Sequence, residues 1–374
     1  MRIGFTTGSC AAAATKAAIY MLLIGGEKNK IKITTPKGID YKTDILDIKK
    51  ENDAVSCGVR KDGGDDPDVT SGSIIYSKVK ILEYESSLNK PKIIIDGGEG
   101  VGRVTKPGLD QPIGNAAINH VPRQMIENEA LKICEMADFN GTIKIIISVP
   151  KGEELAKKTF NPRLGIEGGI SIIGTSGIVE PMSTRAIIDT IKVELNQRKA
   201  SGFNYVAVSP GNYGLDFMKK TYSYDLDKSV KCSNFIGDTI DMAKGLGFKK
   251  LLLTGHIGKL IKVSGGIMNT HSKEGDCRME LLAAAAIRAG ASIETVKKIL
   301  DCVVTEEGIK QLKVDGILEA TMNLVMEKIM YYLTKRAGED MQVECVMYAN
   351  DFGELAKSKG AKEWLILLAQ EQAQ

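Results

Sequence analysis

Apolar and polar residues alternate in short runs along the first half of the chain, the pattern of half-buried strands. Residues 9–24 form an apolar stretch that predicts a helix with Ser9 as its N-cap. The stretch 122–137 opens with Pro122 and predicts a second helix. The expected strands are 31–35, 41–48, 54–59, 74–82, 92–96 and 143–149. We therefore expect residues 1–160 to form an α+β domain with a mostly antiparallel sheet.

The second half has a different rhythm, in which short apolar runs end in small polar loops before a helical segment. This pattern is typical of a doubly wound parallel sheet, so residues 161–374 are expected to form a Rossmann-like domain. The breaker-rich loop 160–169 marks the boundary, and the polar end from about residue 365 is expected to fray. The expected strands are 170–173, 205–208, 250–253 and 344–348, and the expected helices are 183–198, 277–290, 292–301 and 317–335.

Composition narrows the class of protein. The 374 residues carry 50 basic and 47 acidic side chains and only 5% aromatic residues, which argues against a nucleic-acid partner. The seven cysteines are scattered without a C-x-x-C pair, so neither a disulfide framework nor a zinc site is expected. No apolar run reaches the ~20 residues of a membrane span. These features predict a cytoplasmic α/β protein with reduced thiols.

Three glycine-rich loops follow predicted strands, at 174–177, 209–214 and 254–259. In an open parallel sheet, ligands bind outside the carboxyl ends of the strands, so we expect the three loops to share one edge and to hold a cofactor. The alternative is that these glycines only make tight turns. The candidate cofactor-binding residues are Gly174, Thr175, Ser176, Gly177, Ser209, Gly211, Asn212, Thr254, Gly255 and Gly258.

The segment 93–103 resembles a dinucleotide fingerprint, but residues 104–108 contain breakers where a helix should follow. What remains is a glycine loop carrying Glu99, Arg103 and Lys106. This loop is expected either to clamp ligand carboxylates or to be a solvated hairpin loop.

Candidate acid–base groups come from two places. Residues 62–68 gather four aspartates, and crowded carboxylates raise one another's pKa. A bound cation or a charged surface turn are the alternatives for that cluster. Among the three histidines, His256 follows a strand and is the candidate for proton transfer. The histidines are too far apart along the chain to favour a metal site.

Seven motifs stand in order along nearly the whole chain. They are Thr6-Thr-Gly-Ser-Cys-Ala-Ala-Ala-Ala14, Lys61-Asp-Gly-Gly-Asp-Asp-Pro-Asp-Val-Thr70, Gly97-Gly-Glu-Gly-Val-Gly-Arg-Val-Thr-Lys-Pro-Gly-Leu109, Asn161-Pro-Arg-Leu-Gly-Ile166, Gly174-Thr-Ser-Gly-Ile-Val-Glu-Pro-Met182, Gly255-His-Ile-Gly-Lys259 and Asn350-Asp-Phe-Gly-Glu354. Together they resemble the cobalt-precorrin-5B C-1 methyltransferase family of anaerobic cobalamin biosynthesis. One departure from the family pattern is Gly63-Gly64, where Ala-Gly is common.

The resemblance implies a transferase that uses S-adenosyl-L-methionine to methylate carbon 1 of a cobalt corrinoid, giving cobalt-precorrin-6A. Cobalt would arrive inside the substrate, so no metal site is expected in the protein. A polycarboxylate substrate requires cations in a cleft. The candidate substrate-binding residues are Thr7, Glu99, Arg103, Lys106, Arg123, Arg163, Arg185 and Lys259.

The nucleophile would be the macrocycle itself, so the enzyme need only position the reactants and take up or relay a proton. Asp65, Asp66, Asp68 and His256 are the candidates for that role. Two other interpretations stay open: a non-catalytic corrinoid- or tetrapyrrole-binding carrier, and a nucleotide-dependent oxidoreductase. A small-molecule corrinoid is the expected partner, without nucleic acid or membrane. The sequence does not determine the oligomeric state, and a homo-oligomer is one of the alternatives.

Overall fold

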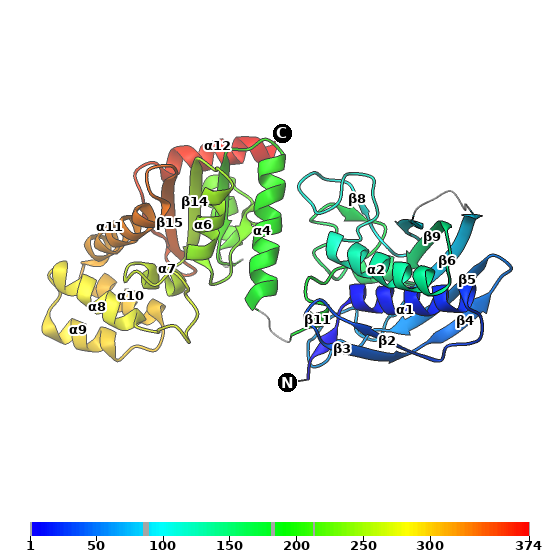
Figure 1. The fold of residues 1–374 in the computed structure, drawn as a ribbon. Coiled ribbons are helices and arrows are strands. Elements are labelled where there is room, and N and C mark those ends of the chain that lie inside the picture. The colour runs from blue at the N-terminus through cyan, green and yellow to red at the C-terminus, as the bar shows by residue number, and fades with distance from the viewer. Residues whose placement is uncertain (1, 85–89, 181–183, 212–213, 374) are drawn as a thin grey trace. The chain divides into compact units, whose positions relative to one another are not determined.

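The computed structural model describes residues 2–84, 90–180, 184–211 and 214–373. The chain forms two compact units, Met1–Ser183 and Thr184–Gln374, each with its own core (Figure 1). The boundary expected after residue 160 therefore lies too early. Residues 161–180 belong to the first unit because their short strands pair within it: β10 (Ile166–Glu167) with β8 (Arg103–Val104), and β11 (Ile178–Val179) with β1 (Gly4–Phe5).

A five-stranded mixed sheet organises the first unit, in the order β4-β5-β6-β9-β7. The pairings from β4 to β9 are antiparallel, and β7 joins β9 in parallel. The run 41–48, which was expected to be one strand, divides between two strands, β3 and β4. Strand β3 pairs with β2 in a separate hairpin. The strands are β2 (Lys30–Thr34), β3 (Asp40–Asp44), β4 (Leu46–Lys50), β5 (Ala54–Arg60), β6 (Ile74–Tyr84), β7 (Lys92–Gly97) and β9 (Gly141–Ser148).

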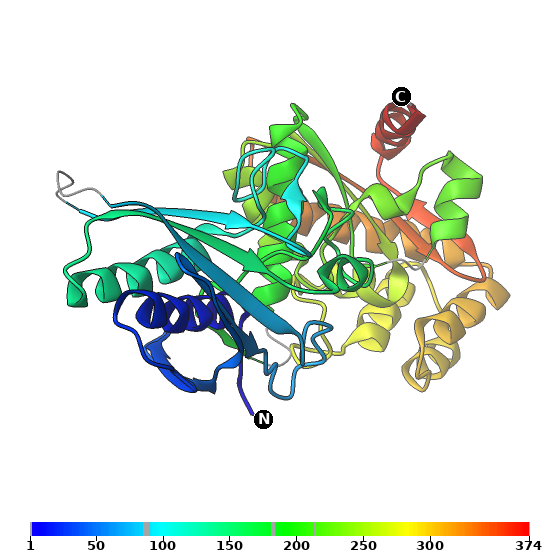
Figure 2. The ribbon, with the colours of Figure 1, turned by 90° about the vertical axis from the view of Figure 1, so that its right-hand side faces the viewer.

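Helices α1 (Thr7–Leu23) and α2 (His120–Met136) lie side by side along this sheet, as both views show (Figures 1 and 2). Every second residue of the central strands is buried in their core, as the pattern Ile143, Ile145, Ile147 shows. Residues 10–14 of α1 are buried on all sides, since cysteine and alanine allow close packing. Its N-cap is Thr6, not the expected Ser9, because the Thr6 hydroxyl accepts the Ser9 N–H at 3.2 Å. Helix α3 (Gly152–Ala156) follows β9.

The second unit is built on the sheet β13-β12-β14-β15-β16. The first four strands are parallel, as the sequence predicts, and β16 returns antiparallel from β15. Strand β14 is buried on both faces: Leu251 and Leu253 face one core and Leu252 faces another. The strands are β12 (Tyr205–Ser209), β13 (Val230–Lys231), β14 (Lys250–His256), β15 (Gln342–Ala349) and β16 (Gly353–Lys357).

Helices cover both faces of this sheet. Helices α4, α6, α7 and α11 pack into the larger core, and α5 and α12 into the smaller one. The helices, including a further group between α7 and α11, are α4 (Thr184–Ala200), α5 (Leu215–Tyr222), α6 (Ile236–Gly245), α7 (Ile257–Val263), α8 (Arg278–Arg288), α9 (Ile293–Leu300), α10 (Thr305–Val314), α11 (Leu318–Ala337) and α12 (Ala361–Ala373). A 3₁₀ turn, Leu226–Lys228, precedes β13.

Two further expectations are wrong. Residues 170–173 form no strand. They make only isolated bridges, at Ile170 and Ile172, to other segments of the first unit. The end of the chain does not fray from residue 365, because Leu365 and Leu368 of α12 are buried against the sheet. None of the helices in the described part of the chain is long and apolar enough to cross a membrane.

Ile145 tests the core of the first unit. It is completely buried in β9, so Ile145→Ala should lower the free energy of unfolding by about 2–5 kcal/mol through lost burial and cavity formation. Ile146→Ala is the matched control, because the neighbouring side chain faces the other side of the strand and is only half-buried. Chemical denaturation measures both, and equal losses would contradict the assigned core face.

Candidate functional site

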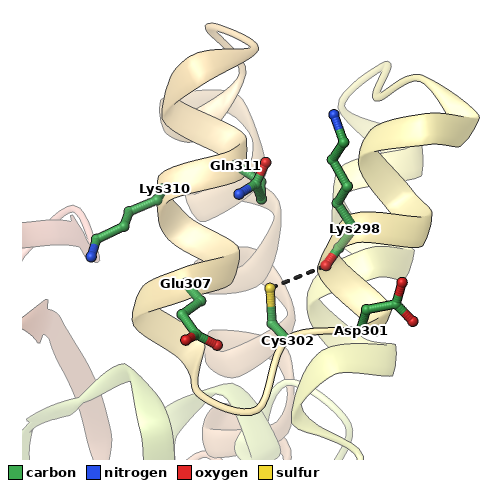
Figure 3. Close-up of a pocket in the computed structure, with 6 residues that line it drawn as sticks. All are labelled: Lys298, Asp301, Cys302, Glu307, Lys310 and Gln311. Atoms are coloured by element: carbon green, nitrogen blue, oxygen red, sulfur yellow. Dashed lines mark hydrogen bonds between the residues drawn. The ribbon is translucent and has the colours of Figure 1, made fainter.

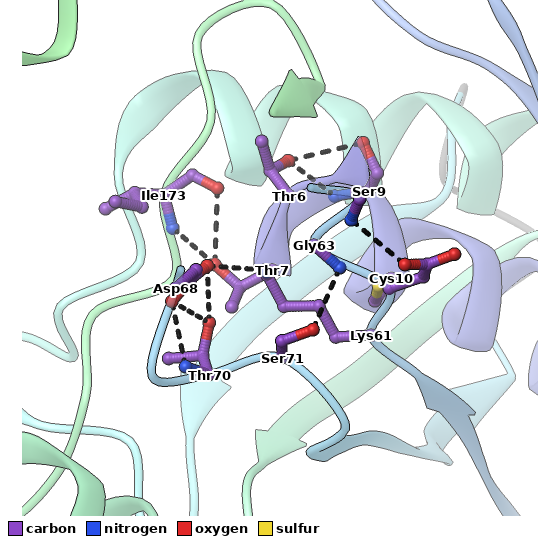
Figure 4. Close-up of polar contacts among 12 residues, drawn as sticks. Thr6, Thr7, Ser9, Cys10, Lys61, Gly63, Asp68, Thr70, Ser71 and Ile173 are labelled. Atoms are coloured by element: carbon purple, nitrogen blue, oxygen red, sulfur yellow. Dashed lines mark hydrogen bonds and ion pairs between the residues drawn. The ribbon is translucent and has the colours of Figure 1, made fainter. Parts of the chain in front are cut away.

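The start of α1 brings together three segments that are distant in sequence (Figure 4). The Thr6 N–H donates to the Gly177 carbonyl at 3.2 Å, and the Gly8 N–H donates to the Ile173 carbonyl at 3.1 Å. The Ser9 hydroxyl also donates to the Gly177 carbonyl, at 2.6 Å. From the other side, the Phe5 N–H donates to the Asp62 carbonyl at 2.8 Å. Three of the seven motifs therefore meet at the buried start of α1.

This assembly changes the place of the first glycine loop. Gly174, Thr175, Ser176 and Gly177 lie beside α1 in the first unit, so the expectation that they share a sheet edge with the loops at 209 and 254 is wrong. Gly174 has a φ of +138°, and a Cβ there would sit 2.2 Å from the Thr6 hydroxyl oxygen. The glycine is thus required by the close approach to α1. Thr7 is occupied in the same contact: its hydroxyl oxygen accepts the Ile173 N–H at 2.9 Å.

A buried ion pair lies at the centre of the aspartate loop. The Lys61 side chain is only 2% exposed, and its ammonium lies 2.5 Å from an Asp68 carboxylate oxygen. The Thr70 N–H donates to the other oxygen at 2.8 Å. Burial by itself would raise the pKa of Asp68, but the Lys61 and Thr70 contacts hold that pKa below its ordinary value. Asp68 is therefore ionised and anchors the loop.

The other aspartates of this loop are nearer the surface. Asp62 pairs with the Arg2 guanidinium, and this hydrogen bond and a second one from the Gly64 N–H lower the pKa of Asp62. Asp65 accepts the Arg2 backbone N–H at 2.6 Å, and Asp66 is half-buried. The expected rise in pKa from crowding does not occur at Asp62 or Asp68, because each carboxylate faces a cation and backbone donors instead of another acid.

The glycine loop at 97–109 packs against the loop 161–167. The Thr105 N–H donates to the Gly165 carbonyl at 2.8 Å, and the Lys106 ammonium donates to the Arg163 carbonyl at 3.2 Å. Arg103 lies 2.8 Å from an Asp96 oxygen. The side chains of Glu99, Arg103, Lys106 and Arg163 are all exposed on this surface. Three cationic side chains of the candidate substrate set are thus gathered on adjoining loops of one unit.

Arg123 has a different environment. Its guanidinium donates to the carbonyls of Ile118, Ile95 and Ala116 at 2.8, 2.9 and 3.4 Å. Burial lowers the pKa of Arg123. These contacts tie α2 to the sheet and to the loop before the helix. Arg185, in contrast, is exposed on α4 in the second unit.

The second unit carries the segment after β12, described up to Gly211, and the junction of β14 with α7 on neighbouring strands. The expectation of a loop at 254–259 is wrong, because Thr254–His256 end β14 and α7 begins directly at Ile257. Strand β12 is followed by β13 on one side of it, whereas β14 and β15 continue on the other side. The strand order therefore reverses between β12 and β14, the position where doubly wound sheets bind ligands. Ser209, Gly211, Thr254, Gly255 and Gly258 lie on the segments that end these two strands. Asn212 lies outside the described residues.

His256 ends β14 and caps α7. Its Nδ1 accepts the Gly258 N–H at 3.1 Å, and its Nε2 lies 2.8 Å from a Glu306 oxygen at the start of α10. A neutral ring that accepts through Nδ1 carries its proton on Nε2, which here faces a carboxylate. The Gly258 N–H therefore orients the ring, and Nε2 lies within ion-pair distance of Glu306. Glu306 is 50 residues away, and no sequence pattern indicated it.

Two lysines lie at the same edge of the sheet. Lys231 donates to the hydroxyls of Ser209 and Ser229, each at 3.2 Å. Lys259 donates to the carbonyls of Pro210 and Ser233 at 3.4 and 3.3 Å, and burial lowers the pKa of its ammonium. No sequence pattern indicated that Lys231 lies at this edge; the sequence shows only that it follows an apolar residue. Thr254 is completely buried, and its hydroxyl has no hydrogen-bond partner among the described residues.

A pocket of about 400 Å³ lies elsewhere, between α9 and α10 (Figure 3). It contains none of the predicted site residues, and its charges balance, so it offers no preference for an anion. Its lining residues are Lys298, Asp301, Cys302, Glu307, Lys310 and Gln311. Within the described part of the chain, no group of histidine, cysteine and acidic side chains could hold a metal ion.

The two units and their loops define an α/β protein with a mixed sheet at its N-terminal end and a largely parallel sheet at its C-terminal end. A family described as CbiD matches residues 1–181, and one described as the CbiD C-terminal domain matches residues 269–359. The cobalt-precorrin-5B C(1)-methyltransferase of Ruminiclostridium cellulolyticum is 49% identical over 94% of this chain and 89% of its own length. The enzyme of that name from Alkaliphilus metalliredigens is 44% identical over 99% and 96%.

The chain belongs to the CbiD family. A crystal structure of the cobalamin biosynthesis protein cbiD from Archaeoglobus fulgidus is 28% identical and covers 73% of this chain and 84% of its own, with a TM-score of 0.39.

Asp68→Asn tests the buried pair. Because the pKa of Asp68 is lowered by folding, its carboxylate contributes stability above the unfolded value of about 4, and this stability is lost as the pH falls through the lower folded value. At pH 7 the variant should lose about 3 kcal/mol of unfolding free energy, since Lys61 stays buried without its partner. The difference from the wild type should shrink below pH 4.

Urea denaturation between pH 7 and pH 2 measures this difference. Asp44→Asn is the control, because Asp44 is 71% exposed and its ion pair with Lys30 is long, at 3.8 Å. If the difference in unfolding free energy between the wild type and Asp68→Asn does not change with pH, the assigned ion pair between Lys61 and Asp68 is wrong.

Proposed function

We propose that this chain is a C-methyltransferase that transfers a methyl group from S-adenosyl-L-methionine to carbon 1 of cobalt-precorrin-5B, giving cobalt-precorrin-6A in anaerobic cobalamin biosynthesis. The observation that carries this proposal is identity of 44–49% with enzymes of that name over nearly the whole chain. The methyl donor follows from the class of reaction. The cysteine usage supports a cytoplasmic enzyme.

The donor site in this proposal is the switch point of the second unit, which we regard as Rossmann-like. Its strand order, β13-β12-β14-β15, supports this proposal, because ligands in such sheets bind at the point where the order reverses, here beside the segment after β12 and the junction of β14 with α7. Ser209, Gly211, Asn212, Thr254, Gly255 and Gly258 are its residues. We leave Gly174–Gly177 out of the donor site, because those residues complete the start of α1 in the first unit.

The acceptor site draws on the first unit. A corrinoid precursor carries acetate and propionate carboxylates, and guanidinium and ammonium groups bind these strongly. Arg103, Lys106 and Arg163 are exposed on adjoining loops and provide this charge, with Glu99 on the same surface. Arg123 and Thr7 are not offered to the substrate here, since the Arg123 guanidinium bonds to the carbonyls of Ile118 and Ile95 and the Thr7 hydroxyl bonds to Ile173.

The chemistry requires little of the protein beyond positioning. The electron-rich macrocycle attacks the methyl group in line with the departing sulfur, and holding both partners in place can supply about 7–11 kcal/mol of the barrier. Asp68 and His256 are held by Lys61 and Glu306, so they serve as positioning groups. Asp65 and Asp66 remain the candidates for receiving a proton.

The oxidoreductase alternative gains no support. A nicotinamide site would place a carboxylate at the end of the second strand, about 20 residues after the glycine loop. Strand β13 ends at that distance in Lys231, followed by Cys232 and Ser233.

An anaerobic assay tests the proposal directly. The purified chain is incubated with cobalt-precorrin-5B and S-adenosylmethionine that carries a deuterated methyl group. We expect one labelled methyl in the corrinoid product by mass spectrometry. A chain that binds the corrinoid but transfers no label is the carrier alternative and contradicts the proposal.

Gly211→Val tests the donor site without disturbing the fold. Gly211 has no left-handed φ, and no described atom lies within 4 Å of the point where a Cβ would be, so the valine is tolerated structurally. It should still fill the space where a ligand approaches the loop. Calorimetry should show at least tenfold weaker binding of S-adenosylhomocysteine, with the melting temperature unchanged.

Gly245→Val at the end of α6 is the matched control, because Gly245 is equally open and lies away from the strand ends. Unchanged affinity in Gly211→Val would remove this loop from the donor site.

A further inference from the structure

Two lysines one turn apart on α7 have unequal partners. The Lys262 side chain is 4% exposed and has a carboxylate, Asp276, at 3.7 Å, together with the Thr270 carbonyl at 3.2 Å. Lys259 is half-buried and has no carboxylate within ion-pair distance among the described residues. The same short helix thus carries one cation with a counter-ion and one without.

The contacts of Lys259 are weak for a desolvated ammonium. Its two acceptors are neutral carbonyls at 3.3 and 3.4 Å, which is long for an N–H···O bond. The neighbouring titratable groups are the buried Cys232 thiol and the Lys262 ammonium, and burial lowers the pKa of Lys259. Keeping a charge in such surroundings is costly unless an anion completes them. An anionic ligand would complete the surroundings of this half-buried ammonium.

The position of Lys259 indicates where that anion comes from. Pro210 follows β12, Ser233 lies just after β13, and Lys259 itself lies on the helix that follows β14. The ammonium thus joins the carboxyl ends of three parallel strands, on the segments that we assign to the methyl donor. A carboxylate on the donor would reach this place, whereas Arg103, Lys106 and Arg163 already provide for the acceptor's carboxylates.

We propose that Lys259 binds the carboxylate of the methionine moiety of the methyl donor, and so belongs to the donor site instead of the substrate set in which the sequence placed it. This inference rests on the proposed function. It makes Lys259 the residue that distinguishes a complete donor from an adenosyl fragment.

The test compares two ligands that share the adenosyl group. S-adenosylhomocysteine carries the amino-acid carboxylate, and 5′-methylthioadenosine lacks it. For Lys259→Met, which keeps the length of the side chain, calorimetry should show at least tenfold weaker binding of S-adenosylhomocysteine and less than twofold change for methylthioadenosine. Lys297→Met, at an exposed lysine of α9, should change neither affinity.

The contrary outcomes are distinct. Unchanged binding of S-adenosylhomocysteine in Lys259→Met overturns the proposal. Loss of both ligands with a lower melting temperature also overturns it and makes Lys259 a structural tie between Pro210 and Ser233. Weaker binding of cobyrinic acid, a polycarboxylate corrinoid, with S-adenosylhomocysteine binding intact assigns the lysine to the acceptor. If the wild type binds neither adenosyl ligand, the proposed donor site fails as well.

Discussion

The first turn of α1 is the constraint on which the first unit depends. A helix leaves its first N–H groups without intrahelical partners, and α1 begins inside the protein, where water cannot supply them. The Thr6 hydroxyl accepts the Ser9 N–H and the Ile173 carbonyl accepts the Gly8 N–H, while the Gly177 carbonyl accepts the N–H of the capping residue Thr6. Gly177 lies 168 positions after Ser9, so the helix start is complete only when the end of the unit folds back on it. The same requirement explains why Ile173 and Gly177 belong to the first unit.

Charge inside this unit follows the same logic. Lys61 is buried beside the helix start and needs a counter-ion, which Asp68 provides with two further donors on its oxygens. Asp68 is consequently a fixed part of the aspartate loop beside the start of α1. The exposed cations gather instead on the loops at 97–109 and 161–167, which the backbone bonds of Thr105 and Val104 hold together.

In the second unit, in contrast, one charged side chain lacks a carboxylate partner among the described residues. Among the described residues, His256 and Lys262 each have a carboxylate, Glu306 and Asp276, whereas the contacts of Lys259 are carbonyls. All three residues lie at or just after the end of β14, at the point where the strand order reverses. Where the neighbouring charged residues have carboxylate partners and one ammonium has none, an anionic ligand fits beside that ammonium. This is the physical basis for our proposal that Lys259 binds the donor.

The sequence by itself determined the elements with strong periodicity: the strands around Ile143–Ile147, the parallel strands β12, β14 and β15, and helices α8, α9 and α11. It also determined the family, because seven ordered motifs are more specific than any single one. Tertiary structure decided which motif serves which purpose. The loop at 174–177 lies in the first unit, where the Gly177 carbonyl accepts the Thr6 N–H and the Ser9 hydroxyl at the start of α1, and α12 is ordered because Leu365 and Leu368 cover the sheet. The partners of Lys61, His256 and Lys259 could not be read from spacing, since charges find their counter-ions in space after the chain has folded.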